Sequence, residues 1–339
     1  MLPLPRAIDP RSLFESYRRP LVVLAALMVA TLVVALAGLA VDPRLITNAP
    51  VWMKPAKFAI SILIYSATLW VLLPAIADRP VFVRVVSWAV LLGLGLEMAL
   101  IALQAARGTT SHFNNTTAFD SMVFGVMGAT IMVVWFLTMV VAALFFRRHL
   151  AHPALTWGVR LGFIGTIVGM GVAILMTFPT PEQQQAAAAG LPQLFNGAHS
   201  VGVADGGPGL PIVGWSTTGG DLRVAHFVGL HSLQVVPLVA VLLMRVSPSW
   251  LAPREQAQLA GIAGVAWIAL TLLLTWQALR GQPVTAPDGL TVTWFLVLAF
   301  AVAVLALLVF ARAARMRPHS VEVRYGESRV DGFPTEVSA

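Results

Sequence analysis

The first long apolar stretch of the chain reads LVVLAALMVATLVVALAGLAV over residues 21–41 and contains no charged side chain. At 1.5 Å per residue, a helix of this length measures about 30 Å, the hydrocarbon thickness of a bilayer. A backbone inside lipid must satisfy its own hydrogen bonds, so the stretch predicts a transmembrane helix. Similar stretches follow at 58–77, 85–106, 121–146, 161–181, 227–244, 257–279 and 290–311. We therefore predict an all-α, polytopic integral membrane bundle of eight transmembrane helices.

The composition supports this class. Hydrophobic residues make up 58% of the 339 residues and charged residues 11%, whereas soluble domains have about 45–50% and about 25%. Such an excess cannot be buried in one soluble core, and it excludes a disordered chain or a coiled coil. Cysteine is absent, which excludes disulfides, thiolate metal sites and iron–sulfur clusters. The net charge of +7 does not indicate nucleic-acid binding, because the basic residues follow the membrane topology.

With the N-terminus in the cytoplasm, 16 of the 22 basic residues fall on the cytoplasmic side. This asymmetry follows the positive-inside rule and predicts a bacterial-type cytoplasmic (inner) membrane protein with both termini cytoplasmic. Residues 1–19 would form a cytoplasmic N-terminal segment and 317–339 a polar, disordered cytoplasmic tail. The alternative for residues 21–37 is a cleaved signal peptide.

Three short motifs recur in the same order, separated by 168 to 173 residues. KPAKF at 54–58 matches RVAHF at 223–227, QAARG at 104–108 matches QALRG at 277–281, and TAFD at 117–120 matches TAPD at 285–288. The pattern predicts a 4+4 duplication, with repeats at 20–155 and 156–316 in the same orientation. The second repeat carries a long extracytoplasmic loop at 180–222, in which residues 182–189 predict a short helix and Asp221 is expected near the N-cap of the sixth span. The alternative is chance similarity in a chain rich in Ala and Leu.

Polar side chains follow one face of three predicted helices, near their extracytoplasmic ends. They are Lys54, Lys57, Ser61 and Tyr65 in the second span, Glu97, Gln104 and Arg107 in the third, and Arg223, His226, His231 and Gln234 in the sixth. Polar faces in lipid turn towards the bundle interior, so we expect them to surround one cavity. Glu97 lies ten residues from the end of its helix, about 15 Å deep.

These residues define the candidate site. We predict that Glu97 and His231 handle a proton. The predicted substrate-binding residues are Lys54, Lys57, Gln104, Arg107, His112, Arg223, His226, Gln234 and Trp215. Trp215 belongs to a Gly- and Pro-rich loop that we expect to close the cavity. The structural alternatives are an ion pair that only fixes helix packing, and lysines that extend to the lipid interface.

The sequence assigns no metal ligand, because His226 and His231 lie about 140° apart around a helix. A metal site built from His112, one of these histidines and Asp120 or Glu97 stays an alternative. We expect binding or transport of a small polar or anionic solute, with proton coupling as an option. The alternatives are a membrane-embedded enzyme or haem or quinone redox protein with a lipid-soluble substrate, and an assembly or scaffold subunit. The predicted partners are the bilayer and a small molecule, and the sequence identifies neither cofactor nor oligomeric state.

Overall fold

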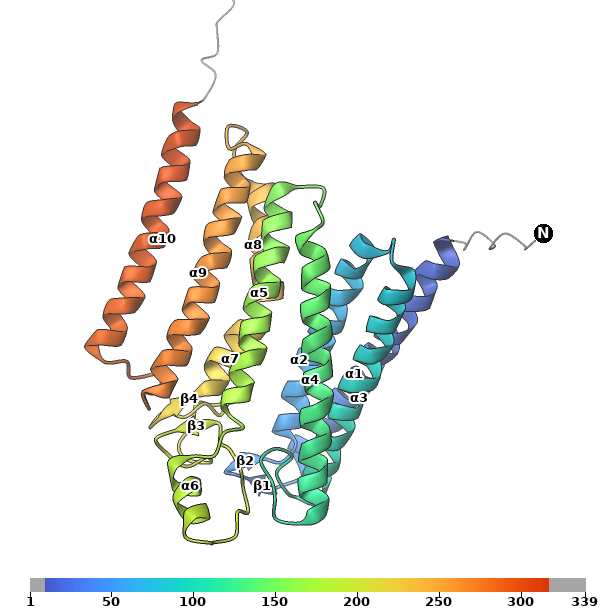
Figure 1. The fold of residues 1–339 in the computed structure, drawn as a ribbon, viewed down its shortest axis with the longest axis vertical. Helices are drawn as coiled ribbons and strands as arrows, with labels where there is room; N and C mark the ends of the chain where they lie inside the picture. The colour runs from blue at the N-terminus through green and yellow to red at the C-terminus, as the bar shows by residue number, and fades with distance from the viewer. Residues whose placement is uncertain (1–9, 317–339) are drawn as a thin grey trace, which may run out of the picture.

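The computed structural model describes residues 10–316, so the predictions for 1–9 and 317–339 lie outside the described part of the chain. It is a helical bundle with very little sheet (Figure 1). The helices are α1 (Pro10–Val41), α2 (Met53–Leu72), the 3-10 helix η1 (Leu73–Ile76), α3 (Pro80–Arg107), α4 (Ala118–Phe146), α5 (Pro153–Leu175), α6 (Pro181–Ala188), α7 (Leu222–Leu230), α8 (Ser232–Val246), α9 (Pro253–Leu279) and α10 (Gly289–Arg315). Two short antiparallel pairs complete it: β1 (Leu45–Ile46) with β2 (Ala49–Pro50), and β3 (Ser200–Val201) with β4 (Gly220–Asp221).

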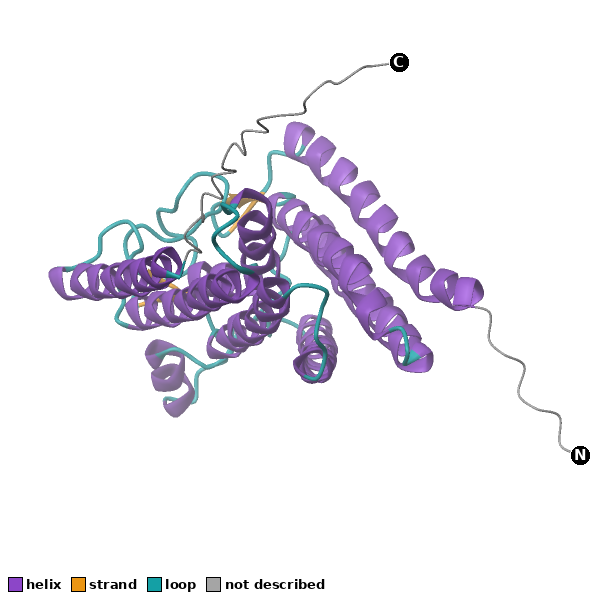
Figure 2. Ribbon diagram, turned by 90° about the horizontal axis from the view of Figure 1, so that it is seen from above, coloured by secondary structure: helices purple, strands orange, loops and turns teal. Residues whose placement is uncertain are grey.

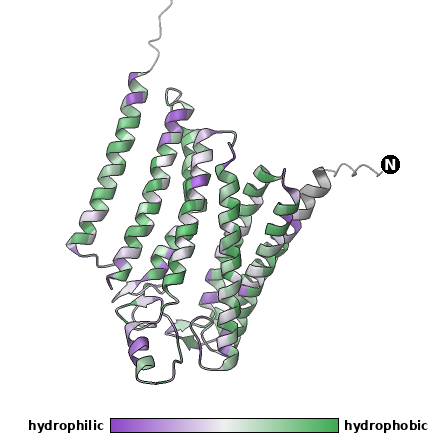
Figure 3. Cartoon of the chain, viewed as in Figure 1, coloured by the Kyte–Doolittle hydropathy of each residue, from purple (hydrophilic) through white to green (hydrophobic). Residues whose placement is uncertain are grey.

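Seven of the described helices are long and apolar enough to cross a membrane. The pair α7 and α8, which meet at an angle of 46°, makes an eighth if it counts as one span. The hydrophobic middle of the helices and their polar ends are visible in Figure 3. The chain is therefore a multi-pass, all-α membrane protein, as its composition predicts.

The helices pack in two groups that share one pattern of neighbours. In the first group α1 packs against α2 and α3, and α3 packs against α4. In the second group α5 packs against α7, α8 and α9, and α9 packs against α10. The seam between the groups lies at α4 and α5, where the rings of Phe145 and Phe163 are 5.2 Å apart. Figure 1 shows α10 at one margin of the bundle, and Figure 2, which is seen from above, shows the helix that leads to the N-terminus, α1, at the opposite margin.

The sixth apolar stretch, which we predicted as one helix, is broken at His231 between α7 and α8. Neighbouring helices supply partners for the carbonyls near the break. The Thr166 hydroxyl donates to the Leu230 carbonyl at 3.0 Å, and the Trp267 indole donates to the Val228 carbonyl at 2.8 Å. Breaks in membrane helices are tolerated where neighbours satisfy the backbone in this way. Hydropathy could not reveal the break, because apolar residues continue through it.

The fifth apolar stretch was predicted to start at residue 161, but α5 begins at Pro153. The predicted stretch begins directly after Arg160, which was counted among the basic residues on the cytoplasmic side. In the structure the Arg160 guanidinium reaches the end of α4 and donates to the carbonyls of Phe145 and Arg148, at 3.4 and 2.9 Å. A cation is favourable near the carbonyl end of a helix. This contact lets α5 extend two turns further than the sequence suggested.

Both strand pairs and α6 lie at the same end of the bundle, the lower end in Figure 1. We call it the lid end, and residues 197–221, which run from Gly197 to the start of α7, are called the lid segment. The short helix that we predicted at residues 182–189 is present as α6, and its N-terminus is closed by a capping box between Thr180 and Gln183. The lid end therefore contains most of the structured connections of the described chain.

Candidate functional site

Lys54, His112 and Glu97 form a chain of polar contacts at the lid end. The Lys54 ammonium lies 3.0 Å from Nδ1 of His112, and Nε2 of His112 lies 3.7 Å from a carboxylate oxygen of Glu97. An ammonium group can only donate, so Nδ1 accepts, and the proton of a neutral His112 ring is on Nε2, facing Glu97. His112 thus joins a cation and a carboxylate that come from two different helices.

Among these three residues, Glu97 has the fewest polar contacts. It is 2% exposed, and its second carboxylate oxygen, Oε2, is buried without a hydrogen-bond partner among the described residues. Burying an unpaired carboxylate oxygen costs free energy, and in most proteins such atoms are hydrogen-bonded. An unsatisfied oxygen of this kind marks Glu97 as a place for a proton or a ligand.

Local structure holds Lys54 and His112 in place, beginning with Lys54. Trp52, just before α2, donates its indole N–H to Asp42 at 2.9 Å, and Asp42 is also ion-paired with Arg44. The Trp52 ring lies directly over Gly38 of α1, where any side chain would collide with it. This packing fixes the first turn of α2, which carries Lys54.

The short loop between α3 and α4 positions His112. The Asn114 side chain donates to Thr109 and to the Thr110 carbonyl, and its carbonyl oxygen accepts from Thr116. Phe113 adopts a left-handed backbone conformation with φ of 62°, which turns the chain immediately after His112. The loop is therefore an ordered, hydrogen-bonded structure in which Asn114 is fully buried.

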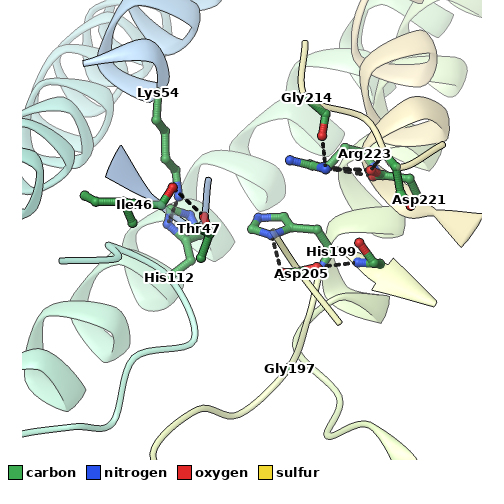
Figure 4. Close-up of polar contacts among 12 residues, drawn as sticks. Ile46, Thr47, Lys54, His112, Gly197, His199, Asp205, Gly214, Asp221 and Arg223 are labelled. Atoms are coloured by element: carbon green, nitrogen blue, oxygen red, sulfur yellow. Dashed lines mark hydrogen bonds and ion pairs between the residues drawn. The ribbon is translucent and has the colours of Figure 1, made fainter. Parts of the chain in front are cut away.

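A second histidine that we did not single out from the sequence belongs to the same region. His199 lies on the lid segment, and its Nδ1 atom is 2.7 Å from a carboxylate oxygen of Asp205. Asp205 also accepts from the backbone N–H groups of His199 and Ser200. Figure 4 shows the His199 ring projecting towards His112 and Lys54. The only sequence signal was a His and an Asp six residues apart in a Gly-rich loop, where the loop conformation decides whether they meet.

Lys57 and Arg223 hold the tip of the lid segment. The Lys57 ammonium donates to the Val213 carbonyl at 2.9 Å, and the Arg223 guanidinium donates to the Gly214 carbonyl at 2.6 Å. Arg223 is also ion-paired with the fully buried carboxylate of Asp221, which caps α7 as its position suggested. The ring of Trp215 packs against Phe227, 5.8 Å between centroids. The lid segment therefore rests on two cations, one from each group of helices.

Gln104 and Arg107 have a different partner. Both donate to the buried carboxylate of Asp120 at the start of α4. Thr116 and Thr117 donate to the other oxygen of Asp120. This carboxylate is saturated with hydrogen bonds, so the arrangement has the character of a structural clamp between α3 and α4. None of these contacts includes Lys54, His112 or Glu97.

The remaining predicted site residues lie along α7 and α8. His226 hydrogen-bonds the Gly169 carbonyl of α5 through Nδ1, at 2.7 Å. His231, at the helix break, lies 3.2 Å from the Gln234 side-chain oxygen, and Gln234 in turn donates to Thr68 of α2. Within the described chain, no hydrogen bond or ion pair joins His231 to Glu97. The two residues predicted to share a proton thus belong to different contact networks.

Burial and charge shift the pKa values of the loop groups. Burial, and then the positive charge of Lys54, hold the pKa of His112 well below its usual value. Burial also lowers the pKa of His199, although the Asp205 carboxylate opposes this shift. For Asp205, burial acts upward, but His199 and the two backbone N–H groups outweigh it and hold the pKa of this carboxyl well below its usual range. The two histidines are therefore neutral at neutral pH, and Asp205 is ionised.

Within residues 10–316, no group of three His, Asp or Glu side chains has the geometry of a metal site. Comparisons of the chain with protein-family models, with curated proteins and with solved structures find no match. The structure and composition by themselves place the chain among the multi-pass helical membrane proteins.

Proposed function

We propose that this membrane protein binds a small anionic solute at the lid end and takes up a proton at Glu97 when it does so. The observation that carries the proposal is the buried oxygen of Glu97 without a partner, next to a histidine that is hydrogen-bonded to Lys54. Lys54, Lys57 and Arg223 would attract the anion, as paired cations do.

The formal charges of the site support this coupling. Lys54, Lys57 and Arg223 are positive, and Glu97, Asp205 and Asp221 are negative; Lys54 and Lys57 lie within electrostatic range of the others. With all six groups ionised, the site is neutral. A proton on Glu97 leaves one net positive charge, which favours an anion in a site of low dielectric constant. Anion binding and proton uptake therefore favour each other, as linkage requires.

The experiment measures both events on purified protein in detergent. Sodium acetate, propionate, lactate, phosphate and sulfate are added at millimolar concentration, with sodium chloride as the reference. Binding is followed by calorimetry and proton uptake by a pH indicator in weak buffer. We expect at least one of these anions to bind with uptake of a proton, and Glu97→Gln to bind it without proton uptake.

Two results would contradict the proposal: binding by none of the anions, or equal proton uptake by wild type and Glu97→Gln. Glu182→Gln is the matched control, because Glu182 is an exposed carboxylate on α6 with no contact to the site. Uptake of the bound anion into proteoliposomes would extend the proposal from binding to transport.

We also propose that the lid end faces away from the cytoplasm and that the chain is a tandem repeat in a bacterial-type inner membrane. The distribution of basic residues supports the orientation. Matched helix ends support the repeat: Gly108 and Gly281 follow α3 and α9 with φ of 73° and 72°, and Gln104 and Gln277 each donate to a carbonyl six residues later. Reporter fusions at residues 113 and 250 should report opposite sides of the membrane, and the same side for both would refute the orientation.

A further inference from the structure

Besides Oε2 of Glu97, the polar atoms at the lid end that have no hydrogen-bond partner within the described chain include two that extend towards one region. One is Nε2 of His199, whose ring bonds Asp205 only through Nδ1. The other is Nη1 of Arg223, whose Nε and Nη2 atoms are used by Asp221 and Gly214. Neither atom is among the buried groups without a partner, so both reach accessible space. Figure 4 shows both side chains extending towards the same region as Lys54 and His112.

The hydrogen bond to Asp205 decides what His199 can offer a ligand. A carboxylate accepts, so Nδ1 of His199 donates and carries the proton. The other nitrogen, Nε2, is then an acceptor with a free lone pair. Asp205 is itself held by two backbone N–H groups, and the Phe113 ring packs against His199 with 4.9 Å between centroids. Both the orientation and the tautomer of the ring are therefore fixed by its surroundings.

Arg223 offers the complementary group. Nη1 of a guanidinium can only donate, and it suits a carboxylate, phosphate or sulfate oxygen. A ligand that satisfies both atoms must carry a negatively charged oxygen for Arg223 and an O–H donor for His199. Lys54 does not supply that donor in the described structure, where its ammonium contacts His112 and makes no hydrogen bond to His199.

We infer that the anion bound at the lid end carries its own O–H group, which donates to Nε2 of His199. Two ligand classes have this chemistry: hydroxycarboxylates and hydrogen phosphate, free or as part of a phosphate monoester. The inference rests on the proposed function, since it names the ligand of that site. It assigns His199 as a specificity residue and Asp205 as the residue that positions it.

The test compares ligands that differ in the O–H group. Lactate is compared with propionate, and phosphate with sulfate, by calorimetry on the full-length protein in detergent near neutral pH. An unpaired acceptor in a site built for a donor discriminates strongly, so we expect about tenfold tighter binding of the O–H ligand in at least one pair. The pair that shows it identifies the ligand class.

The variant His199→Phe removes the lone pair but keeps a ring against Phe113. We expect it to lose the advantage of the O–H ligand, so that the two members of the pair bind with equal affinity. If the O–H ligand keeps its advantage in His199→Phe, the inference is wrong. If wild type binds both members of each pair equally, the inference is wrong and the proposed function stands. If no anion binds, the proposed function itself fails.

A pH series on wild-type protein gives the same answer without a variant. Protonation turns Nε2 of His199 into a donor. Because burial lowers the pKa of His199 below its usual value of about 6.5, the preference for lactate over propionate should be constant above that pH and should be lost as the pH falls below it. The charged and titratable groups that act on His199 are Asp205, Lys54, Arg223, His112 and His226. Two of these, Lys54 and Arg223, act on both ligands alike, so the ratio of the two affinities isolates the O–H contact. An unchanged ratio would also overturn the inference.

Discussion

The Nε2 atom of His112 lies 3.7 Å from a carboxylate oxygen of Glu97, although the two residues belong to different structural elements, a loop and the interior of a transmembrane helix. The other ring nitrogen of His112 contacts Lys54 at 3.0 Å. The imidazole ring of His112 therefore lies between the Lys54 ammonium and a buried carboxylate. The first two predictions concern this chain of contacts.

Replacing Glu97 with Gln should remove proton uptake and leave the protein folded. Glutamine has the same shape as glutamic acid and removes a charge whose Oε2 atom has no partner in the described chain. We expect a melting temperature close to that of wild type, because a buried carboxylate oxygen without a partner no longer has to be accommodated, and this gain offsets the lost attraction to Lys54. Thermal unfolding in detergent measures this. A clear loss of stability would show that Glu97 is required mainly for packing.

Lys54 and Glu97 should be energetically coupled through His112. We expect Lys54→Met to destabilise the protein, since Glu97 then loses its nearest positive charge. The same substitution in a Glu97→Gln background should cost less, with a coupling free energy of about 1–2 kcal/mol. A double-mutant cycle of equilibrium unfolding in mixed micelles measures it. Additive effects would show that the two charges do not interact.

Stability should fall on acidification below about pH 6.5. Burial lowers the pKa values of His112 and His199 in the folded protein, whereas both histidines titrate near 6.5 when unfolded. Between the folded and unfolded pKa values, the unfolded chain binds more protons, so the free energy of unfolding decreases as the pH falls. Above the pKa of the unfolded histidines, the free energy of unfolding does not depend on the protonation of His112 and His199. Melting temperatures from about pH 8 to about pH 5 test this, and His112→Phe should flatten the dependence.

Two carboxylates at helix starts, Asp120 and Asp288, should differ in how much they stabilise the protein. Asp120 is 2% exposed and accepts from Gln104, Arg107, Thr116 and Thr117, so Asp120→Ala should cost about 2–3 kcal/mol. Asp288, at the start of α10, is 40% exposed and contacts Arg280 and Thr291. Asp288→Ala should therefore cost less. Equilibrium unfolding of the two variants compares them, and equal losses would argue against burial as the cause.

The lid segment should loosen when Lys57 is replaced by Met. The Val213 carbonyl then loses its only side-chain donor in the described structure, while the turn between Leu210 and Trp215 keeps its backbone bonds. We expect faster hydrogen exchange in peptides that cover 210–215 and unchanged exchange in α9. Lys57→Arg retains a donor and is the control. Identical exchange in wild type and Lys57→Met would show that the contact does not restrain the lid segment.

Much of the fold is predictable because hydropathy and capping are local properties of the sequence. The apolar stretches predicted the long helices, and the residues around Thr180 and Asp221 predicted a short helix and a helix start that the structure contains. The predicted helix boundaries were wrong where a residue far away in the sequence supplies a contact that the local sequence does not reveal. Arg160 enters α5 because it can reach the end of α4, and α7 ends before His231 because Thr166 and Trp267 satisfy the carbonyls near the break.

The sequence by itself determined that this chain is a helical membrane protein with its unusual charges at one end, since a bilayer imposes one length and one polarity on every span. It did not determine which charges meet. The helical periodicity placed Lys54, Glu97, Arg107 and His231 on polar faces, and only the packing of the helices separated Arg107 and His231 from the other two. The pairing of His199 with Asp205 depends on the path of a loop, which follows from contacts between residues far apart in the chain.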